Sequence, residues 1–284
     1  MPAREIIAGV LELVADLDAH GTRALDVSCR NGEVMTALAA RGFEVRGTRF
    51  ERGLPPIEGM PIDEGVDLTR GLPYPDKSFD LVVLTEVIEH LENHRVALGE
   101  VSRVLRPGGH LILTTPNIMR LDSRLGFMLS GMHKAKRRQI PLDTPLDQAH
   151  RYHNYPIPFV LLYYLMRING LRLERLGHGK VKPFSYVLYA LLYPMVALDT
   201  RLRLVWRERK PPVRLLNREL ARWMLDRRVL TEDNLIVRAR KATEQETLQE
   251  TRPKTAQKTS QKTWTDGSST AAANEGRIGP RAGA

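Results

Sequence analysis

The stretch ALDVSCRNGEVMTALAARGFEVRGTRF, residues 24–50, decides the fold of this 284-residue chain. Residues 24–28 form a short apolar run that is typical of a buried strand, and residues 32–42 carry apolar side chains at helical spacing up to Gly42. Residues 43–50 are a second strand candidate. Strand, helix and strand in this order predict a β-α-β unit.

The loop inside this unit has the outline of a glycine-rich nucleotide loop. In a D-x-G-x-G-x-G loop that begins at Asp26, the three glycine positions are occupied by Ser28, Arg30 and Gly32. Glycines in such a loop let backbone amides at a helix N-terminus approach a cofactor closely. The sequence leaves open whether this is a working cofactor loop with substitutions or the remnant of one.

The chain continues outward from this unit with further strands and helices. Two nearly continuous apolar runs predict central parallel strands that are covered on both faces. The remaining segments alternate between helical and extended patterns. The predicted strands are 79–86, 110–116, 171–176 and 234–241, the predicted helices are 3–19, 94–105 and 158–170, and a turn is expected at RPGG, residues 106–109.

Composition sets the broad class. With 42% hydrophobic residues, the chain supports one main α/β domain, which we place at 1–241, followed by a polar tail at 242–284 that we expect to be disordered. The single cysteine, Cys29, excludes an internal disulfide framework and favours a cytoplasmic location, and no targeting segment is evident.

The positive charge is concentrated in one region. The chain has a formal net charge of +10, and residues 177–230 hold 12 Lys and Arg against 4 Asp and Glu, which gives +8. An acidic surface is therefore a plausible partner for this basic and hydrophobic helical insertion.

Three later stretches carry a family resemblance: LPYPDKSFDLVVLTEVIEHL at 72–91, RVLRPGGHLILTTPN at 103–117, and HNYPIPF at 153–159. With the β-α-β unit, their order resembles the class I S-adenosylmethionine-dependent methyltransferases. The most similar branch includes the ubiquinone-biosynthesis O-methyltransferases and the small-RNA 2'-O-methyltransferases. The resemblance implies a Rossmann-like seven-stranded, mostly parallel sheet with helices on both faces and an antiparallel last strand.

The resemblance also implies a cofactor, S-adenosylmethionine, and residues to hold it. Asp26 would end the first strand near the methionine amino group, and Gly32 would let the helix begin close to the cofactor. Asp67, with Leu68 beside it, would meet the adenine amino group, and Thr85 would lie at the mouth of the fourth strand. The rule that ligands of open α/β sheets bind at the carboxyl ends of the strands independently favours this edge.

Two departures from the family pattern affect this cofactor site. Ser28 and Arg30 add side chains where the backbone should approach the ligand, and Arg49 stands where the family usually has the acid that holds both ribose hydroxyls. Glu51, two residues later, would point the same way as Arg49 if the strand continued, because side chains alternate with period 2.

The sequence EVIEH predicts a possible catalytic group. Glu86, Glu89 and His90 lie where a strand ends and a helical turn begins, so their side chains could converge above the sheet. In the resembled branch, such a set binds Mg²⁺ together with a later histidine, here His153, with His150 as the competitor. His90 and His153 are also candidates to assist deprotonation of an acceptor hydroxyl. The alternative is that Glu86 caps the strand, Glu89 is solvated and His90 packs beneath the loop.

The resemblance does not explain the uncharged run FSYVLYALLYPMVAL, residues 184–198. It is shorter than the roughly 18–20 residues needed to cross a bilayer. Flanking cations, three tyrosines and Trp206 favour a membrane interface, whereas a helix that covers the sheet or forms a dimer contact is the alternative.

Three functional hypotheses follow from these observations. The first is O-methylation of a hydroxyl on a lipid-linked or amphipathic small molecule, by a cytoplasmic enzyme peripheral to the inner face of the membrane. The second is RNA 2'-O-methylation, although the chain shows no aromatic-rich nucleic-acid module that would favour it. The third is a noncatalytic scaffold at a membrane, which the altered loop and Arg49 would explain. The sequence does not predict the oligomeric state.

Overall fold

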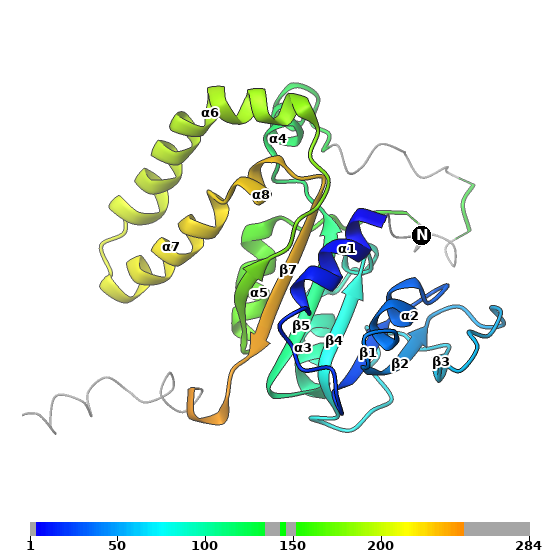
Figure 1. Cartoon of the computed structure of the whole chain (residues 1–284). Coiled ribbons are helices and arrows are strands. Elements are labelled where there is room, and N and C mark those ends of the chain that lie inside the picture. Colours follow the sequence, from blue (N-terminus) through cyan, green and yellow to red (C-terminus); the bar gives the residue numbers. More distant parts are fainter. Residues whose placement is uncertain (1–3, 134–142, 146–151, 247–284) are drawn as a thin grey trace, which may run out of the picture. The chain divides into compact units, whose positions relative to one another are not determined.

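A computed structural model describes residues 4–133, 143–145 and 152–246 of the chain. The described residues up to 243 belong to one compact unit that is built on a seven-stranded sheet in the order β3-β2-β1-β4-β5-β7-β6 (Figure 1). The strands are β1 (Arg23–Val27), β2 (Glu44–Arg49), β3 (Ile62–Glu64), β4 (Phe79–Thr85), β5 (Leu105–Pro116), β6 (Leu171–Leu176) and β7 (Asn234–Lys241).

The sheet is parallel except for β7, which runs antiparallel to both of its neighbours. The predicted Rossmann-like class is therefore confirmed, including its antiparallel last strand. The chain winds from β1 outward through β2 to β3 and then crosses back to β4, so the strand order reverses between β1 and β4. Open α/β sheets bind ligands in the crevice at the carboxyl ends of the strands at such a switch point.

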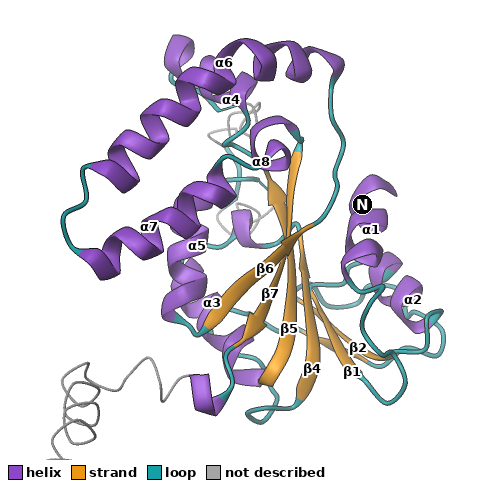
Figure 2. Ribbon diagram, turned by 60° about the vertical axis from the view of Figure 1, so that its left-hand side comes forward, coloured by secondary structure: helices purple, strands orange, loops and turns teal. Residues whose placement is uncertain are grey.

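Helices cover both faces of the sheet (Figure 2). The helical elements are α1 (Arg4–Leu13), α2 (Glu33–Ala39), the 3₁₀ turn η1 (Ile88–His90), α3 (His94–Val104), α4 (Leu121–Ser130), α5 (Phe159–Ile168), α6 (Pro183–Arg201), the π-helical turn η3 (Leu202–Trp206), α7 (Pro211–Met224) and α8 (Arg227–Thr231). α1 and α2 pack on one face, and α3, α5 and α7 pack on the other.

The period of 2 in the central strands explains the two cores. In β4, Leu81 and Val83 face α1 and α2, whereas Val82 and Leu84 face α3 and α5. All four side chains are fully buried. Because both faces are covered, the strand reads as an unbroken apolar run in the sequence.

Two local predictions differ from the structure. The RPGG segment was expected to be a turn, but it lies inside β5, where the pairing with β4 shifts register between Phe79 and Leu81. Gly108 has φ 83°, which absorbs the irregularity without the cost that a side chain would add. β3 has only three residues and no distinctive pattern, so the sequence alone did not identify it.

The 177–230 insertion forms α6, η3, α7 and most of α8. Over the described residues, none of the helices is long and apolar enough to cross a membrane. Of the expected disordered tail, residues 247–284 lie outside the described part of the chain, as does His150.

Candidate functional site

The loop after β1 keeps the backbone of a glycine-rich loop. Ser28, Arg30 and Gly32 all have left-handed backbones, with φ of 62°, 43° and 72°. Two hydrogen bonds from backbone amides to Thr48 hold this shape: the Ser28 amide donates to the side-chain Oγ1 at 3.1 Å and the Cys29 amide to the carbonyl oxygen at 2.9 Å. Non-glycine residues in this region carry a strain of about 1–3 kcal/mol each. The loop therefore has a left-handed backbone at all three positions where a glycine-rich loop has glycine.

Gly32 suits its position, because its φ is left-handed and Ile57 packs directly against it. A Cβ atom at this position would lie 2.1 Å from Ile57 Cδ1, closer than packed atoms allow. The glycine lets α2 begin directly beneath the loop, as the sequence predicts, and Ile57 packs against it. Loop amides at a helix start are suited to a polar or anionic group.

Asp26 is buried beneath this loop, near the end of β1. Its side chain is 3% exposed, and burial raises its pKa to about 7, although a hydrogen bond from the Met35 backbone opposes the rise. A carboxyl group held in so dry a place gains most from a cationic partner. Asp26 therefore fits the predicted position near an ammonium group.

Arg49 does not replace the missing acid of the family. Its guanidinium Nη1 donates to Pro55 O at 2.9 Å and Leu54 O at 3.3 Å, and lies 3.6 Å from Glu64 Oε1. The side chain is 3% exposed. Arg49 thus holds the β2–β3 connection in place, while Glu51 lies half-buried in the same connection.

Asp67 and Leu68 are placed differently from each other. Asp67 Oδ1 accepts hydrogen bonds from the Thr69 amide at 2.9 Å and from Thr69 Oγ1 at 2.7 Å, so local contacts already use part of this carboxylate. Asp67 also lines an open pocket of about 720 Å³ together with Glu64 and Arg70. Leu68 is buried in the core beside the strands.

Thr85 and Glu86, at the end of β4, differ in their hydrogen bonding. Thr85 Oγ1 is buried and has no hydrogen-bond partner among the described residues. Glu86 has φ 53°, and its carboxylate accepts from Thr114 Oγ1 at 2.9 Å and from Asn234 Nδ2 at 3.2 Å. The backbone turn directs Glu86 toward β5 and β7, so Glu86 is not part of the group of ligand atoms that Glu89 and His90 join, although its charge acts on Glu89.

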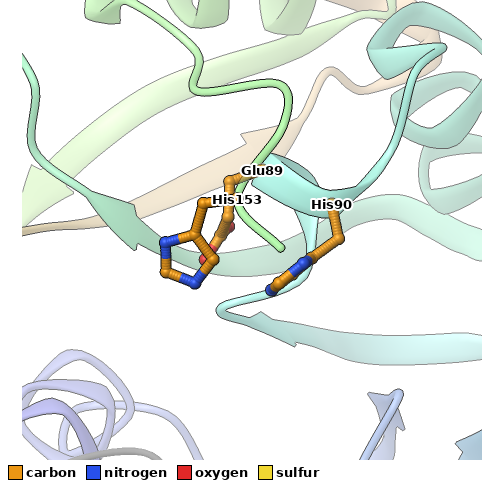
Figure 3. Close-up of side chains that lie close together, drawn as sticks. All are labelled: Glu89, His90 and His153. Carbon is orange, nitrogen blue, oxygen red and sulfur yellow. The ribbon is translucent and has the colours of Figure 1, made fainter. Parts of the chain in front are cut away.

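Glu89, His90 and His153 do converge (Figure 3). One ligand atom from each lies within 4.8 Å of the others. The two imidazole rings meet edge to face, with centroids 4.8 Å apart. Glu89 and His90 come from η1, directly after β4, and His153 comes from the segment that precedes α5.

Backbone contacts explain why a residue 63 positions later reaches this place. The Tyr155 amide donates to Glu89 O at 3.0 Å, and His90 Nδ1 lies 3.0 Å from Tyr152 O. A carbonyl oxygen only accepts, so His90 carries its proton on Nδ1 in this arrangement, and a neutral ring has its lone pair on Nε2. A hydrogen bond of this kind, made by the other ring nitrogen, orients a metal-binding or proton-accepting histidine.

The electrostatics of the group favour a cation. Glu89 is fully buried, and only its Oε2 has a hydrogen-bond partner, Thr115 Oγ1 at 3.1 Å; Oε1 has none among the described residues. Burial, with a smaller contribution from the Glu86 charge, raises the pKa of Glu89 to about 8. Burial lowers the pKa of His153, which keeps this ring neutral near pH 7.

The three residues therefore fit either of two uses. A carboxylate and two imidazoles are a donor set that accepts Mg²⁺ less readily than softer divalent ions. The orphaned oxygen of Glu89 is the feature that a bound cation would satisfy. Without a metal, a neutral His153 could accept a proton from a hydroxyl group nearby.

The sequence reasoning missed three residues that position the acids. Thr114 and Asn234 bind Glu86, and Thr115 binds Glu89. A signal existed, because Thr114 and Thr115 end an apolar strand and Asn234 begins the antiparallel strand beside it. All three therefore lie at the carboxyl edge of the parallel strands.

A family model described as a methyltransferase domain matches residues 2–159, which include every element from α1 to the candidate group. The chain belongs to the class I S-adenosylmethionine-dependent methyltransferase family.

Several characterised methyltransferases are similar to part of the chain. A 27-O-demethylrifamycin SV methyltransferase of Amycolatopsis mediterranei is 33% identical over 117 residues, 38% of this chain and 41% of that protein. The mitochondrial ubiquinone biosynthesis O-methyltransferase of Rattus norvegicus is 28% identical over 176 residues, 58% of this chain and 48% of that protein. The chain thus spans less than half the length of these relatives.

Solved methyltransferase structures share the fold. A SAM-dependent methyltransferase from Archaeoglobus fulgidus aligns with a TM-score of 0.51 and 17% identity, covering 84% of this chain and 95% of that one. The methyltransferase fold confirms the predicted seven-stranded sheet, and the family implies S-adenosylmethionine as cofactor. The loop backbone, Asp26 and the orphaned Thr85 hydroxyl fit that cofactor, whereas Arg49 supplies no acid for its ribose.

Proposed function

We propose that this protein is an S-adenosylmethionine-dependent O-methyltransferase that acts on the hydroxyl group of a lipid-linked or amphipathic small molecule. The observation that carries the proposal is the convergence of Glu89, His90 and His153 within 4.8 Å, directly after β4 at the switch point of the sheet. A donor group at this edge can receive the acceptor hydroxyl while the β1 loop holds the cofactor.

The residues divide the work as follows. S-adenosylmethionine, when bound, supplies the sulfonium methyl group for in-line attack by the hydroxyl oxygen. The β1 loop, Asp26 and Thr85 bind and orient that cofactor. His90, fixed by Tyr152 O, and His153, kept neutral by burial, hold the acceptor hydroxyl or take its proton. Orientation supplies much of the acceleration in such a reaction.

A divalent cation would bind at Glu89, His90 and His153. It would supply Lewis-acid stabilisation of the deprotonated hydroxyl. Chelation distinguishes this use from direct proton transfer to a histidine. If a metal serves, chelator abolishes transfer, leaves cofactor binding intact, and added Mg²⁺ or Mn²⁺ restores transfer.

The acceptor class is tested with a matched pair of phenols. One carries a long alkyl chain, the other lacks it, and transfer of a radiolabelled methyl group from S-adenosylmethionine is measured for both. We expect the alkylated phenol to be the better acceptor when vesicles are present. A single-stranded RNA that is methylated in place of both phenols would instead support RNA 2'-O-methylation.

A second candidate function is a noncatalytic scaffold that retains the fold. Arg49 favours it, because this side chain occupies the position of the ribose-binding acid and is committed to the β2–β3 connection. Calorimetry decides between the two. Binding of S-adenosylmethionine supports the enzyme, and no detectable heat at about 1 mM cofactor, where even a weak site would be half filled, supports the scaffold.

The proposal places the enzyme in the cytoplasm, peripheral to the inner face of the membrane. The exposed apolar side chains of α6 support a membrane location, since a lipid-linked acceptor would be found there.

A further inference from the structure

α6 has two apolar sides, and only one of them is covered by the rest of the domain. On the covered side, Leu188 packs with Leu121 of α4 and Leu230 of α8. The opposite side carries an exposed apolar stripe at spacings of three and four residues. Its members and their exposed fractions are Phe184 59%, Val187 53%, Leu191 71%, Met195 63% and Leu198 52%.

α4 adds further exposed apolar side chains beside α6. The two helices pack against each other, as Figure 1 shows near the carboxyl edge of the sheet. The end of α4 and the residues after it present Phe127 at 48% exposure, Met128 at 73%, Leu129 at 76% and Met132 at 55%. Exposed apolar side chains that gather on neighbouring helices mark interaction sites in proteins that otherwise bury such side chains.

Next to the stripe, a pocket of about 330 Å³ lies between the end of α6 and α7. Arg201, Arg218 and Arg222 line it together with Tyr193 and Trp206. Across the described residues, none of these three arginines takes part in an ion pair, unlike Arg203, which binds Asp199. Arginine binds phosphate through two parallel hydrogen bonds, and Trp and Tyr favour the boundary between lipid and water.

We propose that α6, the end of α4 and the arginine pocket form a docking surface for an anionic phospholipid membrane. The stripe inserts its apolar side chains at the headgroup boundary, and the pocket binds a lipid phosphate. A hydrophobic face flanked by cations is the pattern of helices that lie in a membrane interface.

Charge selects the membrane over a second copy of this chain. The surrounding segment, residues 177–230, has a net charge of +8, so a symmetric pair would bring two strongly positive surfaces together. A phospholipid surface with negative headgroups supplies both the apolar layer and the opposite charge.

The topology places this surface near the candidate site. α4 follows the end of β5, and α6 follows the end of β6, which runs in the same direction as β5. Both helices therefore begin at the edge of the sheet where Glu89 lies. Docking at this surface would bring the enzyme to an acceptor that is held in the membrane, and this part of the inference rests on the function proposed above.

The test measures binding of the full chain to vesicles by flotation, without acceptor or cofactor. Phosphatidylcholine vesicles with and without phosphatidylglycerol are compared, at low salt and at about 1 M salt, where the Debye length falls to about 3 Å. Wild type should bind the phosphatidylglycerol vesicles and weaken at high salt without losing all binding. A wild type that ignores these vesicles at low salt overturns the proposal.

Two double variants separate the apolar and the charged contributions. Leu191→Ser with Met195→Ser should abolish the salt-resistant binding, because these are the most exposed members of the stripe. Arg218→Gln with Arg222→Gln should weaken binding to phosphatidylglycerol vesicles about tenfold or more. Arg23→Gln with Arg95→Gln removes the same charge from exposed positions elsewhere and should change binding less than about threefold. Equal losses of vesicle binding in both arginine variants would overturn the role of the pocket in binding a lipid phosphate.

Sizing and a soluble acceptor keep the outcomes distinct. If Leu191→Ser with Met195→Ser converts a dimer to a monomer, a second copy occupies the stripe and the membrane proposal is wrong. The same variant should stay folded by circular dichroism and methylate a water-soluble phenol as wild type does. Vesicle binding without any methyl transfer would overturn the proposed function alone, and transfer without vesicle binding would overturn the docking surface alone.

Discussion

The β1–β2 half and the β4–β5 half of the carboxyl edge differ in how their buried polar side chains are bound. At β4 and just after it, Thr85 Oγ1 and Glu89 Oε1 are buried with no partner among the described residues. At β2, Arg49 is nearly as buried, and its Nη1 donates to two carbonyl oxygens of the next loop, which leaves its buried Nε without a partner among the described residues. Buried polar groups normally find partners within the protein, so the unpartnered ones indicate where a ligand belongs.

The same contrast separates two acids that are three residues apart. Glu86 accepts hydrogen bonds from Thr114 and Asn234, whereas Glu89 has one oxygen bound, one without a partner among the described residues, and two histidines close by. Residue type alone would assign the two acids the same role. The hydrogen-bond partners, which depend on the left-handed backbone at Glu86, assign Glu86 to the structure and Glu89 to the candidate site.

The strongest test of the β4–β5 half is Glu89→Gln. Loss of this carboxyl group should lower methyl transfer by about 10²–10⁴-fold, because the amide can neither bind a cation as a carboxylate nor exchange a proton beside the histidines. Cofactor affinity should change less than about threefold, since Glu89 lies outside the β1 loop. Transfer rate and calorimetry measure the two quantities.

Glu92→Gln is the matched control, because Glu92 is exposed at the end of the same segment. It should retain wild-type transfer. Wild-type turnover by Glu89→Gln would remove Glu89 from the proposed catalytic group.

The β1 half is probed by Asp26→Asn and pH. The pKa of Asp26 is raised by burial from 3.8 to about 7, so the folded protein binds the proton more tightly than the unfolded chain does. The resulting stability is fully present below about pH 4 and is lost as pH rises through 7. A rise of about three pKa units corresponds to at most about 4 kcal/mol of folding stability.

Asp26→Asn removes this titration, so urea unfolding at pH 5 and pH 8 measures it. The stability of the variant relative to wild type should increase by about 2–4 kcal/mol between these pH values. S-adenosylmethionine should stabilise wild type more than the variant at pH 8, because its ammonium group offsets the buried carboxylate. Parallel pH profiles for the two proteins would show that folding does not raise the pKa of Asp26.

The comparison also shows what the sequence could and could not provide. Apolar runs such as residues 79–86 define central strands by themselves, because burial on both faces leaves no polar position. β3, with three residues, was expected only through the family resemblance. In the site, Glu89, His90 and His153 were named correctly as a converging set, but Glu86 was included because helical spacing does not report a left-handed turn. The role of Arg49 depended on Leu54 and Pro55 carbonyls, which no side-chain pattern encodes.

Arg49→Met tests whether Arg49 serves the fold or the cofactor. Removing the guanidinium leaves the Leu54 and Pro55 carbonyls without this donor, so the free energy of unfolding should fall by about 1–3 kcal/mol. Cofactor affinity, measured at a temperature where the variant is folded, should change less than about threefold. A large loss of affinity with unchanged stability would mean that Arg49 binds the cofactor directly and that the two halves of the edge are alike.

The smallest expected effect concerns the strain in the β1 loop. Ser28 has φ 62°, a conformation in which glycine avoids the steric cost that other residues carry. Ser28→Gly should relieve that cost, but it also increases the conformational entropy of the unfolded chain, so the net gain in stability should be about 0–1 kcal/mol. Ser130→Gly is the opposite control, because Ser130 is helical, and there glycine should destabilise the protein by about 0.5–1 kcal/mol. Thermal unfolding of both variants, with calorimetry of S-adenosylmethionine binding, measures the outcome.

If Ser28→Gly tightens cofactor binding about tenfold, the serine side chain hinders the ligand and the loop is a weakened one. Unchanged affinity would show that a loop of this path binds its ligand through the backbone, whichever side chains stand at the glycine positions.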